Sequence, residues 1–217
     1  MQKIKLIIAI AAIFSANIAN AQESYDLTET WQKNINVPAS QGSTIEKLFS
    51  AWGKEFPGKY IDAFNKFQKT GKADKIEYNG TPIDFNVDIA PKNGYIEIKG
   101  SHTITITEDG NYQKGDVITK EHILNAAYWN LPNGNKLLGI SVKDDGEVFA
   151  ECLLAFYEYN ASNGTLTPRN DLSKKVMNVI ENDHEIFIIL PKKGLNLEYY
   201  DYASKTNKTI KWNGNGF

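Results

Sequence analysis

The feature that most constrains the fold is a change of hydrophobic period after Gly71. Before it, apolar residues recur at the spacing of a helix; after it they alternate with polar residues, as in Ile83-Asp-Phe-Asn-Val-Asp-Ile89. Strict alternation is typical of a strand with one buried face and one wet face. Because the helical part precedes the β-rich part, we expect an α+β fold rather than a parallel α/β sheet: N-terminal helices packed on a long, mostly antiparallel, meandering sheet.

Turn dipeptides mark the boundaries between the predicted strands. Asn-Gly or Asp-Gly occurs at 79–80, 93–94, 109–110, 133–134, 145–146 and 163–164. These residues favour the positive φ values of type I′ hairpin turns. The predicted strands lie near 75–78, 83–90, 94–98, 102–107, 125–131, 136–143, 148–159, 186–190, 195–202 and 208–212. The similarity of Phe156-Tyr-Glu-Tyr159 to Tyr199-Tyr-Asp-Tyr202 predicts two similar hairpins in one sheet.

Two helices are predicted before the sheet, over about 44–52 and from Pro57 to a stop at Gly71. Ser43-x-x-Glu46 has the pattern of a capping box, and Gly53 is interpreted as the end of the first helix. A third, short helix is predicted after Asp171, with that aspartate as its cap.

Residues 1–21 have the pattern of a secretory signal peptide. A basic start precedes the apolar run Leu6–Phe14, and Ala19-Asn-Ala21 supplies a cleavage site before Gln22. The run is well short of the ~20 residues that span a bilayer. We expect export to the periplasm or the cell exterior, without a stable membrane anchor. Residues 22–217 would form one α+β domain, with an arm at 22–42 that packs by its aromatic residue, a helical part at 43–71 and mostly β hairpins at 72–217.

Charge and cysteine content exclude other classes. Without the signal the chain has 22 basic against 26 acidic residues, and Arg169 is its only arginine, so a nucleic-acid partner is not expected. Cys152 is the only cysteine, which rules out an intramolecular disulfide and is interpreted as a buried structural thiol.

Four stretches of the C-terminal half carry a family resemblance. They are Ala127-Tyr-Trp-Asn-Leu-Pro-Asn-Gly-Asn-Lys-Leu-Leu-Gly-Ile-Ser141, Leu154-Ala-Phe-Tyr-Glu-Tyr-Asn160 with Leu166-Thr-Pro168, Ile189-Leu-Pro-Lys-Lys-Gly194, and Trp212-Asn-Gly214 with Phe217. Over about residues 120–217 the chain resembles small secreted proteins common in Bacteroidota, a functionally uncharacterised family. The resemblance implies a bacterial signal peptide, and it assigns no catalytic residue.

Acid–base and metal chemistry offer few candidates. A histidine-based hydrolase would need His102, His122 or His184 within hydrogen-bond reach of a serine or carboxylate inside a pocket, and none of the specific hydrolase motifs is present. Asp183-His-Glu185, or Asp144-Asp145 with Glu147, could supply metal ligands but lacks calcium-loop spacing, and Asp144-Asp145-Gly146 is interpreted as a hairpin turn. No catalytic residue, metal site or cofactor is therefore assigned.

Tyrosines give the candidate binding residues. Tyr157 and Tyr159 share one face of their predicted strand, and Tyr200 and Tyr202 share a face with Glu198. If the opposite faces are core, these tyrosines point outward and suit stacking on a sugar or a protein partner. Cross-strand pairing, or cover by the N-terminal helices, is the structural alternative.

The leading functional hypothesis is a secreted or periplasmic non-catalytic binding protein for an unknown glycan or protein. A hydrolase with a histidine or metal site is one alternative, and a structural envelope component is another.

Overall fold

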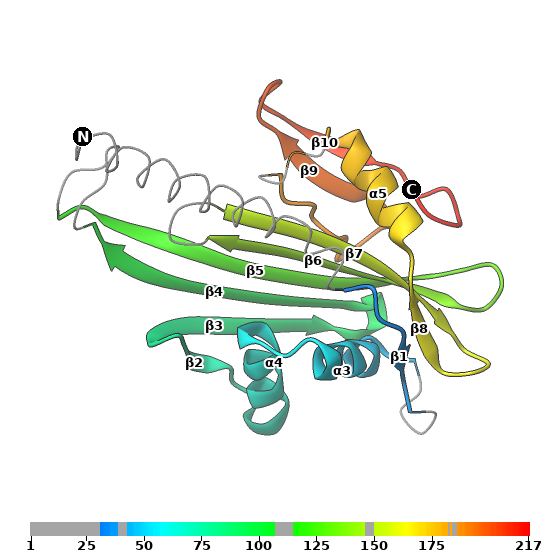
Figure 1. The fold of residues 1–217 in the computed structure, drawn as a ribbon, viewed down its shortest axis with the longest axis horizontal. Helices are drawn as coiled ribbons and strands as arrows, with labels where there is room; N and C mark the ends of the chain where they lie inside the picture. The colour runs from blue at the N-terminus through cyan, green and yellow to red at the C-terminus, as the bar shows by residue number, and fades with distance from the viewer. Residues whose placement is uncertain (1–30, 39–42, 107–114, 146–149, 182, 184–185) are drawn as a thin grey trace, which may run out of the picture.

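The fold is α+β, as predicted, with N-terminal helices on an eight-stranded antiparallel meander and a separate C-terminal hairpin (Figure 1). The structure is a computed structural model that describes residues 31–38, 43–106, 115–145, 150–181, 183 and 186–217. The predicted signal peptide and its cleavage site lie outside these residues. Among the helices that are described, none is long and apolar enough to cross a membrane.

The large sheet has the strand order β1-β8-β7-β6-β5-β4-β3-β2. Every strand from β2 to β8 pairs antiparallel with a sequence neighbour, whereas β1 joins the far edge by pairing Ile35 with Leu166 of β8. The strands are β1 (Ile35–Asn36), β2 (Asp74–Tyr78), β3 (Thr81–Ala90), β4 (Tyr95–Thr105), β5 (Val117–Asn130), β6 (Lys136–Asp145), β7 (Ala150–Asn160) and β8 (Thr165–Pro168). The short 3-10 helix η2 (Pro91–Asn93) joins β3 to β4.

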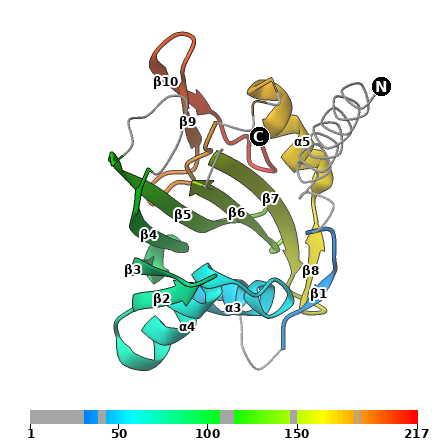
Figure 2. The ribbon, with the colours of Figure 1, turned by 60° about the vertical axis from the view of Figure 1, so that its left-hand side comes forward.

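Layers cover both faces of this sheet (Figure 2). Helices α3 (Ile45–Glu55) and α4 (Lys59–Thr70) lie on one side, and α5 (Asn170–Val179) with the hairpin of β9 (Leu197–Asp201) and β10 (Thr206–Ile210) lies on the other. Alternate side chains of the central strands therefore enter two different cores. The helix-side core includes Phe49, Phe64, Ile98, Leu124 and Ile140. The opposite core includes Trp129, Leu137, Phe156, Leu197 and Phe217.

The two N-terminal helices form where the spacing of apolar residues predicts them, but the residues at their ends differ in part from the prediction. The N-cap of α3 is Thr44, whose side chain makes no capping hydrogen bond, so the predicted capping box is wrong. Gly53 also does not end α3, which continues to Glu55. A Cβ at Gly53 would lie 2.5 Å from the Cδ1 of Ile61, so glycine allows α3 and α4 to pack closely. Gly71 ends α4 in the left-handed conformation (φ 76°), as predicted.

Several strand predictions need correction. The segments 94–98 and 102–107 form the single strand β4, and β5 begins at Val117 rather than near 125. Strand β8 has no range among the predicted strands, although the hairpin predicted after Tyr159 implies it, and 186–190 contributes only the bridge between Ile189 and Glu198. Helix α5 begins before Asp171 with Arg169 as its N-cap, so Asp171 is not the cap.

The turns and the repeat also differ in part from expectation. Among the described Asn-Gly turns, Asn79-Gly80 has positive φ at both residues, while Gly94, Gly134 and Gly164 have it alone. Asp109-Gly110 and Gly146 lie outside the described residues. The two similar hairpins lie in different sheets, because β9 and β10 form a two-stranded sheet of their own.

Candidate functional site

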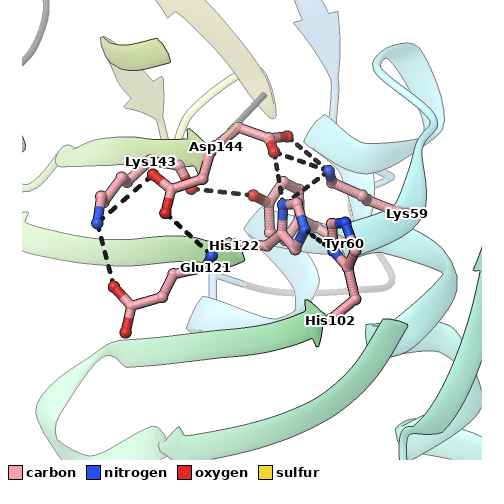
Figure 3. Close-up of polar contacts among 8 residues, drawn as sticks. Lys59, Tyr60, His102, Glu121, His122, Lys143 and Asp144 are labelled. Atoms are coloured by element: carbon pink, nitrogen blue, oxygen red, sulfur yellow. Dashed lines mark hydrogen bonds and ion pairs between the residues drawn. The ribbon is translucent and has the colours of Figure 1, made fainter. Parts of the chain in front are cut away.

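A row of three polar side chains crosses adjacent strands on the helix-side face of the sheet (Figure 3). Asp144 of β6 lies directly opposite His122 of β5. His102 of β4 pairs in register with Lys120, two residues from His122 on the same face, which makes the two histidines diagonal neighbours. Strand register thus brings together residues 20 to 42 positions apart in the sequence.

Short contacts connect the row. The Nδ1 of His122 lies 2.5 Å from the Oδ1 of Asp144, and its Nε2 lies 2.8 Å from the Nδ1 of His102. The two imidazole planes are within 8° of each other with ring centroids 5.0 Å apart. Because 2.8 Å is shorter than the ~3.5–4.0 Å contact of stacked atoms, the rings meet edge to edge through a hydrogen bond.

Helix α4 contributes a buried ammonium to the row. The Nζ of Lys59 lies 2.7 Å from Oδ2 of Asp144 and 3.0 Å from Nδ1 of His122. The side chain of Lys59 is 8 % exposed and that of His122 is 3 % exposed, whereas Asp144 retains 28 %. Lys59 is the first residue of α4, the positive end of the helix dipole, where a cation is disfavoured. The buried ammonium therefore depends on the Asp144 carboxylate for its charge balance.

Tyr60 fixes the start of α4 against the sheet. Its hydroxyl donates a hydrogen bond of 3.1 Å to the backbone carbonyl of Lys143, next to Asp144. Burial first, and then the negative charge of Asp144, raise the pKa of Tyr60 well above its ordinary value, so this hydroxyl keeps its proton. The contact positions Lys59 over the carboxylate.

Two members of the row have shifted pKa values. Burial raises the pKa of Asp144, but hydrogen bonds from His122 and Lys59 outweigh it and hold the pKa below its ordinary value. Burial, followed by the charges of His122 and Lys59, lowers the pKa of His102. At neutral pH the row therefore contains an ionised Asp144 and an uncharged His102.

The contact with the Asp144 carboxylate, which is shorter than the 3.0 Å approach of Lys59 to the same nitrogen, favours one pair of tautomers. An ionised carboxylate 2.5 Å from Nδ1 of His122 requires a proton on that nitrogen. When His122 is uncharged, its Nε2 then accepts, and Nδ1 of His102 must be the donor. The remaining nitrogen of His102, Nε2, carries a lone pair.

His102 lines a pocket of about 340 Å³. Its wall includes the Asn79 turn between β2 and β3, with Tyr78 and Thr81 on either side, and Ile104 beside His102. Lys59, His122 and Asp144 also reach this pocket, so the buried row is connected to it. The pocket offers an unprotonated imidazole, charged groups and an aromatic ring to a small polar molecule.

Metal binding does not fit this geometry. Both ring nitrogens of His122 are engaged, and Lys59 occupies the carboxylate of Asp144. Within the described ranges, no group of three or more His, Cys, Asp or Glu side chains is placed to hold a metal ion. His184, Glu185 and Glu147, which the sequence offered as ligands, lie outside those ranges.

The tyrosines predicted as binding residues separate into two pairs. Tyr157 and Tyr159 are 0 % and 5 % exposed, so the expectation that they face outward is wrong: the N-terminal helices and arm cover that face of β7. Tyr200 and Tyr202 are 41 % and 64 % exposed, and Glu198 is exposed with them. These three point outward as expected.

The sequence offered His102 and His122 as candidates that would need a nearby carboxylate, but it predicted neither their proximity to each other nor the partners Asp144 and Lys59. Asp144 is not a turn residue but the penultimate residue of β6, directed into the row. Lys59 was predicted only as part of the second helix, without a role in a site, and His122 lay outside every predicted strand. Cys152 is buried, as predicted, on β7.

Comparison with protein-family models, with curated proteins and with solved structures gave no match to this chain.

Proposed function

We propose that this protein is an exported enzyme that uses His102 as a general base on a small polar substrate. The observation that supports the proposal is the hydrogen-bonded row from Asp144 through His122 to His102, which ends at the wall of a pocket. Each part of the row has a distinct task. His102 accepts the proton, His122 shares the resulting charge, and Asp144 orients His122.

The charges of the row suit a base that works near neutral pH. Burial, followed by the charges of His122 and Lys59, lowers the pKa of His102, so the base form is present at neutral pH before substrate arrives. When Nε2 of His102 takes a proton, Nδ1 keeps its hydrogen bond to His122, whose opposite edge faces the Asp144 carboxylate. A positioned base of this kind contributes about 10²- to 10⁴-fold in rate.

Hydrolysis is the reaction class that needs the fewest additional groups. His102 takes a proton from a water, the resulting hydroxide attacks a carbonyl or phosphoryl centre, and the leaving group departs with a proton returned from His102. No serine or cysteine nucleophile is required. The histidine-based hydrolase considered from the sequence is therefore the version of the enzyme that we favour.

Hydrolysis of chromogenic substrates tests the proposal. The mature chain is assayed with p-nitrophenyl acetate and bis(p-nitrophenyl) phosphate between pH 4 and 8. We expect turnover that falls on the acid side of pH 6.5, since the pKa of His102 is lowered from that value, and a loss of at least about 100-fold in His102→Gln. Thr103→Ala, an exposed neighbour on the opposite face of β4, is the matched control.

Histidine NMR tests the geometry without any substrate. Long-range ¹H–¹⁵N correlations distinguish a ring protonated on Nδ1 from one protonated on Nε2. We expect both His102 and His122 to carry their proton on Nδ1 at pH 7.5. A His102 ring protonated on Nε2 would remove the base and contradict the proposed enzyme.

A binding protein without catalysis is the second candidate. The outward Tyr200 and Tyr202 of β9 favour it, because exposed aromatic rings are the side chains that binding surfaces use most. It predicts that His102→Gln changes no activity.

A further inference from the structure

The outer face of the β9–β10 hairpin has no role in the proposed active site. The inner face is anchored in the core by Leu197 and Ile210, which are 0 % and 8 % exposed. Their neighbours on the strands therefore point away from the protein. This outer face presents Glu198 and Tyr200 on β9, and it presents their cross-strand partners Thr209 and Asn207 on β10.

Two tyrosine rings form a corner at one end of this face. The rings of Tyr200 and Tyr202 are 5.0 Å apart between centroids and inclined at 80°. Tyr202 follows β9 in a turn that Asp201 stabilises: its carboxylate accepts hydrogen bonds from the backbone N–H groups of Ala203 (2.9 Å) and Ser204 (3.2 Å) and from the Ser204 hydroxyl (2.7 Å). The backbone turn that carries Tyr202 is thus ordered before a ligand binds, which lowers the entropy lost on binding.

Unused polar groups flank the rings. In the described part of the chain, the side chains of Glu198, Asn207 and Thr209 make no hydrogen bond or ion pair. A carboxylate accepts, an amide both donates and accepts, and a hydroxyl does either. The face therefore combines exposed aromatic surface with donors and acceptors that are available to a ligand.

The size of the face favours a small ligand. Two five-residue strands give a surface about 17 Å long and about 10 Å wide, or roughly 170 Å². A stable protein interface needs about 800 Å² on each partner. A second protein would therefore have to extend far beyond these side chains, whereas one or two sugar rings would not.

The charge of the face disfavours an anionic ligand. Glu198 is the only charged side chain among its four strand residues, and Lys208 belongs to the opposite face, where it lies 3.9 Å from Asp201. A phosphate or an acidic polymer would meet an unpaired carboxylate here instead of a cation. Sugar rings match both properties, because they have an apolar C–H face and an uncharged rim of hydroxyls.

We propose that the outer face of the β9–β10 hairpin is a binding site for a neutral saccharide. The C–H face of one sugar ring stacks on Tyr202 beside Tyr200, and its hydroxyls hydrogen-bond to Glu198 and Asn207. The site deepens the second candidate function by naming its ligand class. It does not depend on the chemistry of His102.

Native gels that contain soluble neutral polysaccharides test this site. The probes are an α-glucan, a β-glucan, a xylan and a mannan, each compared with a gel lacking polysaccharide. We expect at least one of them to retard the mature protein, about tenfold weaker binding in Tyr202→Ala, and retained binding in Tyr202→Phe, which keeps the ring. Val117→Ala is the matched control, since Val117 is 66 % exposed and lines neither site, whereas Tyr78→Ala reports on the His102 pocket.

Four results would overturn the site. The first is that none of the four polysaccharides retards the protein, and the second is unchanged retardation of the double variant Tyr200→Ala/Tyr202→Ala. The third is a dimer in sedimentation that Tyr202→Ala dissociates, because this would identify the face as a protein interface. Loss of binding in Tyr78→Ala alone would place the saccharide at the His102 pocket and would also overturn it. The esterase assay of His102→Gln reports separately on the proposed enzyme.

Discussion

Two hairpins of this protein carry nearly the same aromatic sequence, but its tyrosines are buried in one hairpin and exposed to solvent in the other. Tyr157 and Tyr159 of the β7–β8 hairpin are 0 % and 5 % exposed, whereas the matching Tyr200 and Tyr202 of the β9–β10 hairpin are 41 % and 64 % exposed. Strand β7 lies inside the eight-stranded sheet with a layer on each face. Among the described residues, β9 pairs along its length with β10 and through one bridge with Ile189, and it is covered on one face.

Alternation of apolar and polar residues locates a strand in the sequence but does not show which of its faces is exposed to solvent. Both strands place tyrosines at alternate positions, and the pattern is equally compatible with either environment. What differs is whether distant segments, here α3 and the arm with Trp31, come to cover the face. The burial of these tyrosines is a tertiary property.

The largest expected effect is that of truncating Tyr157. Its ring is fully buried between the sheet and the N-terminal helices, so Tyr157→Ala leaves a large cavity. We expect the free energy of unfolding to fall by about 4 kcal/mol. Urea denaturation followed by tryptophan fluorescence measures it, and a loss below about 1 kcal/mol would contradict the buried position.

The Tyr157 hydroxyl is expected to contribute less than its ring. It donates a hydrogen bond to the backbone carbonyl of Trp31, which ties the arm to β7. Tyr157→Phe removes this bond and should lower the free energy of unfolding by about 1 kcal/mol. Tyr159→Phe is the control, because the Tyr159 hydroxyl bonds to no described residue, and equal losses in the two variants would argue against the contact.

The carboxylate between the two buried tyrosines should make the hairpin sensitive to acid. Hydrogen bonds from Asn135 first, and then from Asn133 and Arg169, hold the pKa of Glu158 below its ordinary value of 4.5. A lowered folded-state pKa means that this stabilisation is complete above pH 4.5 and is lost as the pH falls below it.

Glu158→Gln should therefore lower the free energy of unfolding by about 0.5 kcal/mol at pH 7, as expected for a partly exposed ion pair such as that with Arg169. It should also reduce the further loss of stability as the pH falls toward pH 3. Urea titrations at pH 7 and pH 3.5 measure both effects. The same acid sensitivity in wild type and Glu158→Gln would assign it to other carboxylates.

The smallest effect is expected in the second hairpin. Tyr200→Ala and Tyr202→Ala remove exposed rings, so each should change the free energy of unfolding by no more than about 0.5 kcal/mol. Thermal denaturation of both variants beside Tyr157→Ala completes the comparison. A large loss in Tyr202→Ala would show that the ring is needed for folding and would weaken its assignment to a ligand.

The fold class could be predicted from the sequence because its signals are local. The change of period after Gly71 and the alternation in 83–89 each depend on neighbouring residues, and both elements formed as expected. The ends of elements were less predictable, because tertiary packing moved them. Gly53, for example, is the point of closest approach between α3 and α4 and not a helix stop.

The candidate site could not be predicted because it depends on the register of β4 and β5. A two-residue turn at Asp109-Gly110 would pair His102 with Val117 and put His122 on the opposite face. The actual register pairs His102 with Lys120, and this difference of three residues brings the two imidazoles together. A shift of one residue in the pairing moves every side chain of a strand to the opposite face of the sheet. The site therefore cannot be predicted from a sequence that does not determine the register.

The pairing of β1 with β8 sets the order in which the sheet can be completed. From β2 to β8 each strand adds to its predecessor, so loop closure is short and the ladder can grow as the chain emerges. The first strand is different, because Ile35 has no ladder partner until Leu166 is in place. A strand near the start of the chain is thus among the last to pair, and residues 35–36 remain available to other strands until the sheet is nearly complete.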